Sequence, residues 1–113
     1  MPAKLFNPAV SSFGYHQIVP AITILDGIAG WIDVDLSAAV GIGRKLVYML
    51  VWTDVGGYVG VRETGSGLSA FVSMGIIGDH AGFFVNTDAA GHFEAYRQGV
   101  GWPNYYQVLG YFL

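Results

Sequence analysis

Hydrophobic and polar residues alternate strictly in the segment "GWIDVDLS", residues 30–37. Its apolar side carries Ile32, Val34 and Leu36, and its other side carries a tryptophan and two aspartates. Successive side chains of a β-strand point to opposite faces. The alternation therefore predicts a strand with one face in a core and the other toward water.

The next hydrophobic segment does not alternate. Residues 46–52, "LVYMLVW", are seven apolar residues in a row. We interpret the run as a strand covered on both faces, by its own core on one side and by another subunit on the other. The residues expected at that subunit interface are Leu46, Tyr48, Leu50 and Trp52. The alternative is a compact monomer that covers both faces internally.

Short apolar segments separated by glycine-rich turns continue along the chain. The pattern predicts strands over 18–25, 30–37, 45–53, 58–64, 68–77, 83–88, 92–98 and 105–113. The only helical candidates are the few residues after Ser37 and those around Ala89. About eight antiparallel strands joined by short loops predict an all-β fold, a single jelly-roll-like β-sandwich over residues 18–113.

The first 17 residues carry two prolines and no hydrophobic period, and they predict an extended N-terminal arm. An arm this rich in large apolar side chains is expected to lie on a protein surface. The side chains expected to dock are Leu5, Phe6, Phe13 and Tyr15. The alternative is a frayed terminus, which is common.

The composition limits the classes of function. Of the 113 residues, 53% are hydrophobic and only 12% are charged, so apolar surface is left over for subunit contacts. A formal net charge of −3 with scattered basic residues predicts no nucleic-acid partner. There are no cysteines, so disulfides and thiolate metal sites are excluded. Neither a membrane span nor a signal peptide is expected.

Catalytic and metal-binding patterns are weak. Asp79 beside His80 could orient an imidazole, but no serine lies in a nucleophile-elbow motif. His92 and Glu94 share one strand face, as do two aspartates of the alternating strand, yet neither pair has a third defined ligand. We therefore expect no enzymatic activity, no metal and no cofactor.

A glycan-binding function is harder to dismiss. The segment "GWPNYYQ", residues 101–107, groups aromatic rings with amide side chains, which suits a sugar. The candidate contacts are Trp102, Asn104, Tyr105 and Tyr106. This alternative makes the chain a receptor-binding module acting at a host cell surface. The competing interpretation places these rings at the end of the core or in a subunit interface.

Four segments in order, "GWIDVDLSAAVGIGRKLVYMLV", "VGVRETGS", "FFVNTDAAGHFEAY" and "YQVLGYF", cover most of the chain from Gly30 to Phe112. This order resembles a small domain of tailed-bacteriophage structural proteins. The resemblance implies a β-sandwich that assembles on virions or in tail fibres, often as a trimer and without enzymatic activity. The positions that carry it look structural: Trp31, Leu36, Arg62, Gly65, Gly91, Phe93 and Tyr111.

The function expected from the sequence is therefore a non-enzymatic virion structural protein, of the capsid-decoration or tail-fibre type. It would form a homo-oligomer, a trimer by the resemblance, and attach through its arm to capsid or tail proteins. Its expected location is the virion, the extracellular particle.

Overall fold

A computed structural model of the chain describes residues 14–67, 72–74 and 79–112. Nearly all of its regular structure is β. Within these ranges, the strands and one short helix are β1 Tyr15–Leu25, β2 Gly30–Asp35, α2 Ser37–Val40, β3 Leu46–Thr53, β4 Gly57–Val59, β5 Val61–Arg62, β6 Val72–Met74, β7 His80–Asn86, β8 His92–Arg97 and β9 Asn104–Phe112. No helix within these ranges is both long enough and apolar enough to cross a bilayer.

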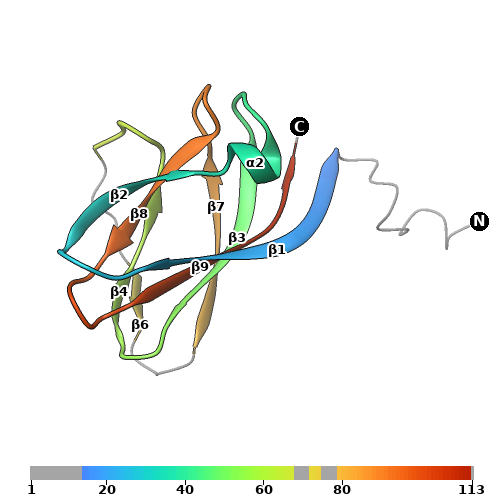
Figure 1. Cartoon of the computed structure of the whole chain (residues 1–113). Coiled ribbons are helices and arrows are strands. Elements are labelled where there is room, and N and C mark those ends of the chain that lie inside the picture. Colours follow the sequence, from blue (N-terminus) through green and yellow to red (C-terminus); the bar gives the residue numbers. More distant parts are fainter. Residues whose placement is uncertain (1–13, 68–71, 75–78, 113) are drawn as a thin grey trace, which may run out of the picture.

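The strands form two layers of antiparallel sheet, as expected for a β-sandwich (Figure 1). One layer has the order β1-β9-β3-β7. The other contains a three-stranded sheet of order β2-β8-β5 and a two-stranded sheet β4-β6, which follow one another because β4 and β5 are separated only by Gly60. In Figure 1 the last strand, β9 in red, lies between β1 in blue and β3 in green.

The pairing follows the jelly-roll pattern. The first strand pairs with the last, and strands successively closer to the middle of the chain pair with each other. The pairs are β1 with β9, β2 with β8, β3 with β7 and β4 with β6. A long hairpin of four strand pairs has thus rolled up so that alternate pairs fall in opposite layers. The jelly-roll-like sandwich predicted from the sequence is confirmed.

The core lies between the layers and is built from alternate residues of each strand. In β3 the inward side chains are Val47, Met49 and Val51, all fully buried. Across the core, β8 contributes Phe93 and Ala95, which are also buried. The alternation predicted for residues 30–37 is confirmed, because Val34 and Leu36 are buried while both aspartates of the segment are exposed.

Some element boundaries differ from the sequence predictions. The expected strand 58–64 is divided at Gly60, whose carbonyl accepts a hydrogen bond of 3.0 Å from the N–H of Tyr96 on β8. Residues 80–82, expected in a loop, belong to β7 because each pairs with β3. Residues 15–17, expected in the arm, are the start of β1 and pair with β9. The helix after Leu36 is confirmed over Ser37–Val40.

Two expectations fall partly outside the described residues. Of the predicted strand 68–77, the structure describes residues 72–74, which are the strand β6. Of the predicted arm, residues 1–13 lie outside the described ranges.

Candidate interaction surface

The outward face of the β1-β9-β3-β7 sheet is organised as four rows, each with one residue from every strand. The strand register defines the rows. In the order β1, β9, β3, β7, row 1 is Ile24, Tyr105, Trp52 and His80; row 2 is Ile22, Gln107, Leu50 and Gly82; row 3 is Gln17, Gly110, Tyr48 and Phe84; row 4 is Tyr15, Phe112, Leu46 and Asn86. None of these side chains carries a carboxylate, ammonium or guanidinium group. We call this surface the uncharged face.

Aromatic rings pack against one another along the rows. In row 1 the Trp52 ring has His80 on one side, with ring centroids 4.5 Å apart, and Tyr105 on the other, stacked at 5.3 Å. In row 3 the rings of Tyr48 and Phe84 lie 4.8 Å apart. The Trp52 ring is therefore packed between two neighbouring rings within row 1.

Two glycines make room for tyrosine rings on this face. A Cβ on Gly82 would lie 2.9 Å from the Tyr48 hydroxyl, so the absence of a side chain lets the Tyr48 ring lean over β7. Gly110 does the same for Tyr15, whose hydroxyl end lies over it and whose ring also contacts the Phe112 ring, with centroids 5.0 Å apart. Both tyrosines therefore reach across a neighbouring strand.

Large apolar side chains on the uncharged face remain open to solvent in the single chain. Ile22 is 53% exposed, Ile24 is 59% exposed and Phe84 is 59% exposed. Isolated apolar residues on a surface are ordinary, but a contiguous patch marks an interaction site. Four strands about 4.8 Å apart and four rows about 6.8 Å apart give this patch a projected area of roughly 500 Å².

The four residues expected at a subunit interface all point outward onto the uncharged face. Leu46 is exposed and Tyr48, Leu50 and Trp52 are half-buried, while the residues between them fill the core. The apolar run of β3 thus has one face in the core and one face on the surface. Contact of that outer face with another subunit stays a prediction.

Of the four residues expected to dock the arm, three, Leu5, Phe6 and Phe13, lie outside the described residues. The fourth, Tyr15, is wrong as an arm residue. It is the first residue of β1, is paired with Phe112 and contributes to row 4.

The structure does not bring the four candidate glycan contacts together on a surface. Trp102, in the loop before β9, is 50% exposed, and Tyr105 faces outward in row 1. Asn104 and Tyr106 point into the core and are 0% and 1% exposed. A glycan site made of these four residues is therefore wrong, because successive residues of β9 face opposite sides of its sheet.

The two buried members of that set serve the core instead. The Asn104 amide donates hydrogen bonds of 3.0 Å to the backbone oxygens of Tyr58 and Tyr96, and its oxygen accepts one of 2.8 Å from the Gln98 amide. These bonds tie β9 to the opposite layer, where Tyr58 lies on β4 and Tyr96 on β8. The prediction that this segment forms an exposed glycan-binding surface did not include this role.

The outer face of the second layer has the opposite chemistry. Arg62 on β5 forms a 2.6 Å ion pair with Glu94 on β8, and its guanidinium lies 4.2 Å from the centroid of the Trp31 ring. Beside them, the His92 ring lies between Asp33, at 2.6 Å, and Asp35, at 3.5 Å. The sandwich therefore has one charged face and one uncharged face.

Hydrogen bonds and neighbouring charges set the ionisation of this charged face. The hydrogen bond to Asp33 raises the pKa of His92, and the charges of the nearby aspartates act in the same direction. Hydrogen bonds from Ser37 lower the pKa of Asp35. Across residues 14–67, 72–74 and 79–112, no three histidine, aspartate or glutamate side chains are grouped to hold a metal ion.

His80, proposed with Asp79 as a catalytic pair, lies on β7 in contact with the Trp52 ring. Asp79 is exposed and precedes the strand. The structure therefore places this imidazole within an aromatic row, and no nucleophilic serine accompanies it in the described rows.

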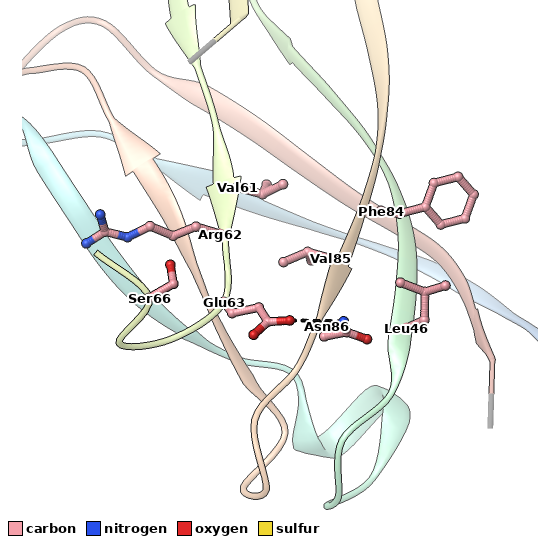
Figure 2. Close-up of a pocket in the computed structure, with 8 residues that line it drawn as sticks. All are labelled: Leu46, Val61, Arg62, Glu63, Ser66, Phe84, Val85 and Asn86. Atoms are coloured by element: carbon pink, nitrogen blue, oxygen red, sulfur yellow. Dashed lines mark hydrogen bonds between the residues drawn. The ribbon is translucent and has the colours of Figure 1, made fainter. Parts of the chain in front are cut away.

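A hollow of about 400 Å³ opens beside β7, between that strand and β5 (Figure 2). Its lining combines Val61 and Val85 with Glu63, whose carboxylate accepts hydrogen bonds from Asn86 at 3.0 Å and from Arg44 at 2.7 Å. In Figure 2 the Phe84 ring points away from the two valines. Both bonds lower the pKa of Glu63, so it stays ionised near neutral pH and is unsuited to act as a general acid.

Comparisons of the chain with protein-family models, curated proteins and solved structures found no match.

Sequence reasoning located the β3 part of the uncharged face and missed the rest. Ile22 and Ile24 alternate with their neighbours in β1, so a period-two pattern was available there. Their position beside Tyr105 and Gln107 depends on the pairing of the first strand with the last, for which the local pattern carries no signal.

Proposed function

We propose that this chain is a non-enzymatic structural subunit that self-associates through its uncharged face. The observation that carries the proposal is the set of four rows without a charged side chain, on a chain whose opposite face is charged. Packing constraints within one chain do not account for it, because the inner residues of the same strands already fill the core.

The size of the uncharged face supports association. Two copies that each cover roughly 500 Å² would bury about 1,000 Å² together, which reaches the lower bound for specific interfaces. Hydrophobic burial of that extent contributes on the order of 10 kcal/mol before the cost of association is subtracted.

The assignment to a virion is supported by the resemblance of the sequence segments to tailed-phage structural proteins and by the jelly-roll topology, which viral capsid proteins use widely. The same topology also occurs in lectins and enzymes, so topology alone does not determine the function. We propose a capsid-decoration or fibre-type subunit that attaches to capsid or tail proteins through its N-terminal segment.

The glycan-binding alternative receives less support. Two of its four contact residues are buried, and both faces of the Trp52 ring are covered by neighbouring rings. A sugar stacks on the face of an aromatic ring, and the Trp52 ring already packs against His80 and Tyr105 on its two sides.

The direct test is the native mass of the purified chain, measured by light scattering on a sizing column. We expect an oligomer for the unaltered chain and a monomer for Leu50→Asp, which places a carboxylate in the middle of the uncharged face. Ile28→Asp is the matched control, because Ile28 is 77% exposed and lies outside the face. An unaltered chain that is monomeric at high concentration would contradict the proposal.

Attachment through the N-terminal segment is tested separately. β1 begins at Tyr15, so a chain that lacks residues 1–13 keeps every described strand. We expect this shortened chain to self-associate normally and to lose binding to particles that the full chain decorates. Equal binding of both chains would contradict the attachment role.

A further inference from the structure

The uncharged face is bordered by charged residues that differ between its two ends. Three aspartates lie at the row 1 end: Asp26 follows β1, Asp54 follows the end of β3 and Asp79 precedes β7. At the row 4 end, Arg44 and Lys45 immediately precede β3, Asp88 follows β7, and Glu63 is paired with Arg44. The face is therefore apolar in its middle, acidic at the row 1 end and of mixed charge at the row 4 end.

The aspartates at the row 1 end affect the ionisation of a tyrosine on the uncharged face. A hydrogen bond to Asp54 raises the pKa of Tyr105 in row 1, and the charges of Asp54 and Asp26 act in the same direction. At the row 4 end, Arg44 is ion-paired with Glu63 at 2.7 Å, while the Lys45 ammonium donates a hydrogen bond to the backbone oxygen of Ile42. Lys45 is thus the cation at this end whose bond is to a neutral group.

Two copies can cover their uncharged faces by packing the sheets face to face about a two-fold axis that lies between them. An axis parallel to the strands would place row 1 of one copy over row 1 of the other. The aspartates of both copies would then face each other, and like charges at an interface are unfavourable. An axis perpendicular to the strands reverses the rows, so each acidic row 1 end lies over the partner's row 4 end, which carries Arg44 and Lys45 as well as acidic residues, and the repulsion between the two acidic ends is avoided.

This inference rests on the proposed function and names the partner and its orientation. We propose that the uncharged face binds a second copy of this chain about a two-fold axis perpendicular to the strands, with row 1 of each copy over row 4 of the other. Each strand then lies over the same strand of the partner subunit and runs in the opposite direction.

The reversed arrangement places each strand over the same strand of the partner subunit. Gln107 then lies over the partner's Gly110 and Phe84 over the partner's Gly82, positions that the ends of two tyrosine side chains already cover within each copy. Leu50 meets the partner's Tyr48, and Trp52 meets the partner's Leu46.

The opposite sheet offers no second surface of this kind within the described residues, because its outer face carries Asp33, Glu94 and Arg62. A closed trimer needs two different contact patches on each subunit, so the single uncharged face favours a pair over the trimer implied by the resemblance.

Cysteine cross-linking tests the orientation, because the chain has no cysteine of its own. We would prepare Trp52→Cys and Leu46→Cys chains separately and treat each, and their mixture, with a short bismaleimide. Rows 1 and 4 are about 20 Å apart along the strands. The reversed arrangement therefore predicts cross-linked dimers in the mixture and almost none from either variant alone. Efficient cross-linking of Trp52→Cys with itself would overturn it.

Charge exchange provides an independent measurement. Asp54→Lys with Asp79→Lys removes the acidic character of the row 1 end, and Arg44→Glu with Lys45→Glu makes both ends acidic. We expect each variant alone to show a dissociation constant raised at least tenfold, and an equimolar mixture to recover a stable pair. The control Asp33→Lys with Asp35→Lys makes the same change in net charge on the opposite sheet and should leave the association unchanged.

The outcomes separate this inference from the proposed function. A chain that is monomeric under all conditions contradicts both. A chain that associates, loses association in Leu50→Asp and yet cross-links through Trp52→Cys alone keeps the proposed function and overturns the reversed pairing. A trimeric mass overturns the two-fold pair while the self-associating function remains. Unfolding curves of each variant identify any loss that comes from misfolding.

Discussion

The hydroxyl of Tyr106 lies 2.6 Å from the backbone oxygen of Tyr96 and joins the two layers of the sandwich. Tyr106 is on β9 and Tyr96 is on β8, so the bond crosses the core. Burial raises the pKa of Tyr106 to about 12, which keeps the phenol protonated and able to donate throughout the neutral range.

Replacing Tyr106 with phenylalanine should destabilise the fold while preserving its shape. The substitution removes a buried donor and leaves the Tyr96 carbonyl with one fewer partner, at a cost of about 1–2 kcal/mol. Urea unfolding followed by circular dichroism measures the change. Tyr105→Phe is the control, since that side chain lies on the outer face, where water can replace the lost bond. An equal decrease in the free energy of unfolding for the two variants would show that the hydrogen bond between the layers contributes no more to stability than an exposed one.

Asn104→Ala should cost more. The asparagine amide is fully buried and bonds to two backbone oxygens and to Gln98, so truncation leaves several buried polar groups unpaired. We expect a loss of about 2–4 kcal/mol in the free energy of unfolding. Asn86→Ala, which removes a bond to the partly exposed Glu63, should cost under about 1 kcal/mol. A loss no larger for Asn104 than for Asn86 would contradict the assigned role.

His92 should titrate above its ordinary pKa of about 6.5. Its hydrogen bond to Asp33 favours the imidazolium in the folded state, so the resulting stabilisation is fully present below pH 6.5 and is lost as pH rises through the raised pKa. The titration of the ring resonances by NMR gives the midpoint. Asp33→Asn should move it back toward 6.5, and an unchanged midpoint would rule out Asp33 as the cause.

Gly110→Ala should loosen the start of β1. A Cβ at this position would collide with the Tyr15 ring, which packs on the bare backbone of β9. We expect faster amide exchange at residues 15–17 with the core unchanged. Gly82→Ala is the comparison, because the corresponding atoms of Tyr48 lie farther from its Cβ, with the hydroxyl at 2.9 Å, and a small movement of that ring relieves the contact. Similar exchange rates in both variants would refute the special role of Gly110.

The parts of the fold that local pattern controls could be predicted from the sequence. The strict alternation around Val34 places that strand correctly, and the apolar run of β3 shows both a buried and an unusual outer face. The strand count and the sandwich followed from turn spacing. Each of these features depends on residues close together in the chain.

The parts that failed depend on pairing between distant residues. His80 looked like a loop residue because it follows Asp79 and glycines, yet pairing with Trp52 makes it part of β7. Asn104 and Tyr106 looked like partners of Trp102 until strand β9 turned them inward. A slip of one residue in pairing register exchanges the two faces of a strand, so a surface cluster inferred inside a strand depends on a register that the local sequence determines poorly.

The position of β9 between β1 and β3 has a consequence for synthesis. Until Asn104–Phe112 have left the ribosome, the sheet that carries the uncharged face lacks an inner strand, and β1 has no partner among the described strands. Aromatic rows that span all four strands cannot exist on such a nascent chain. Pairing through the uncharged face, as proposed above, therefore requires that β9 has already been synthesised and has joined its sheet.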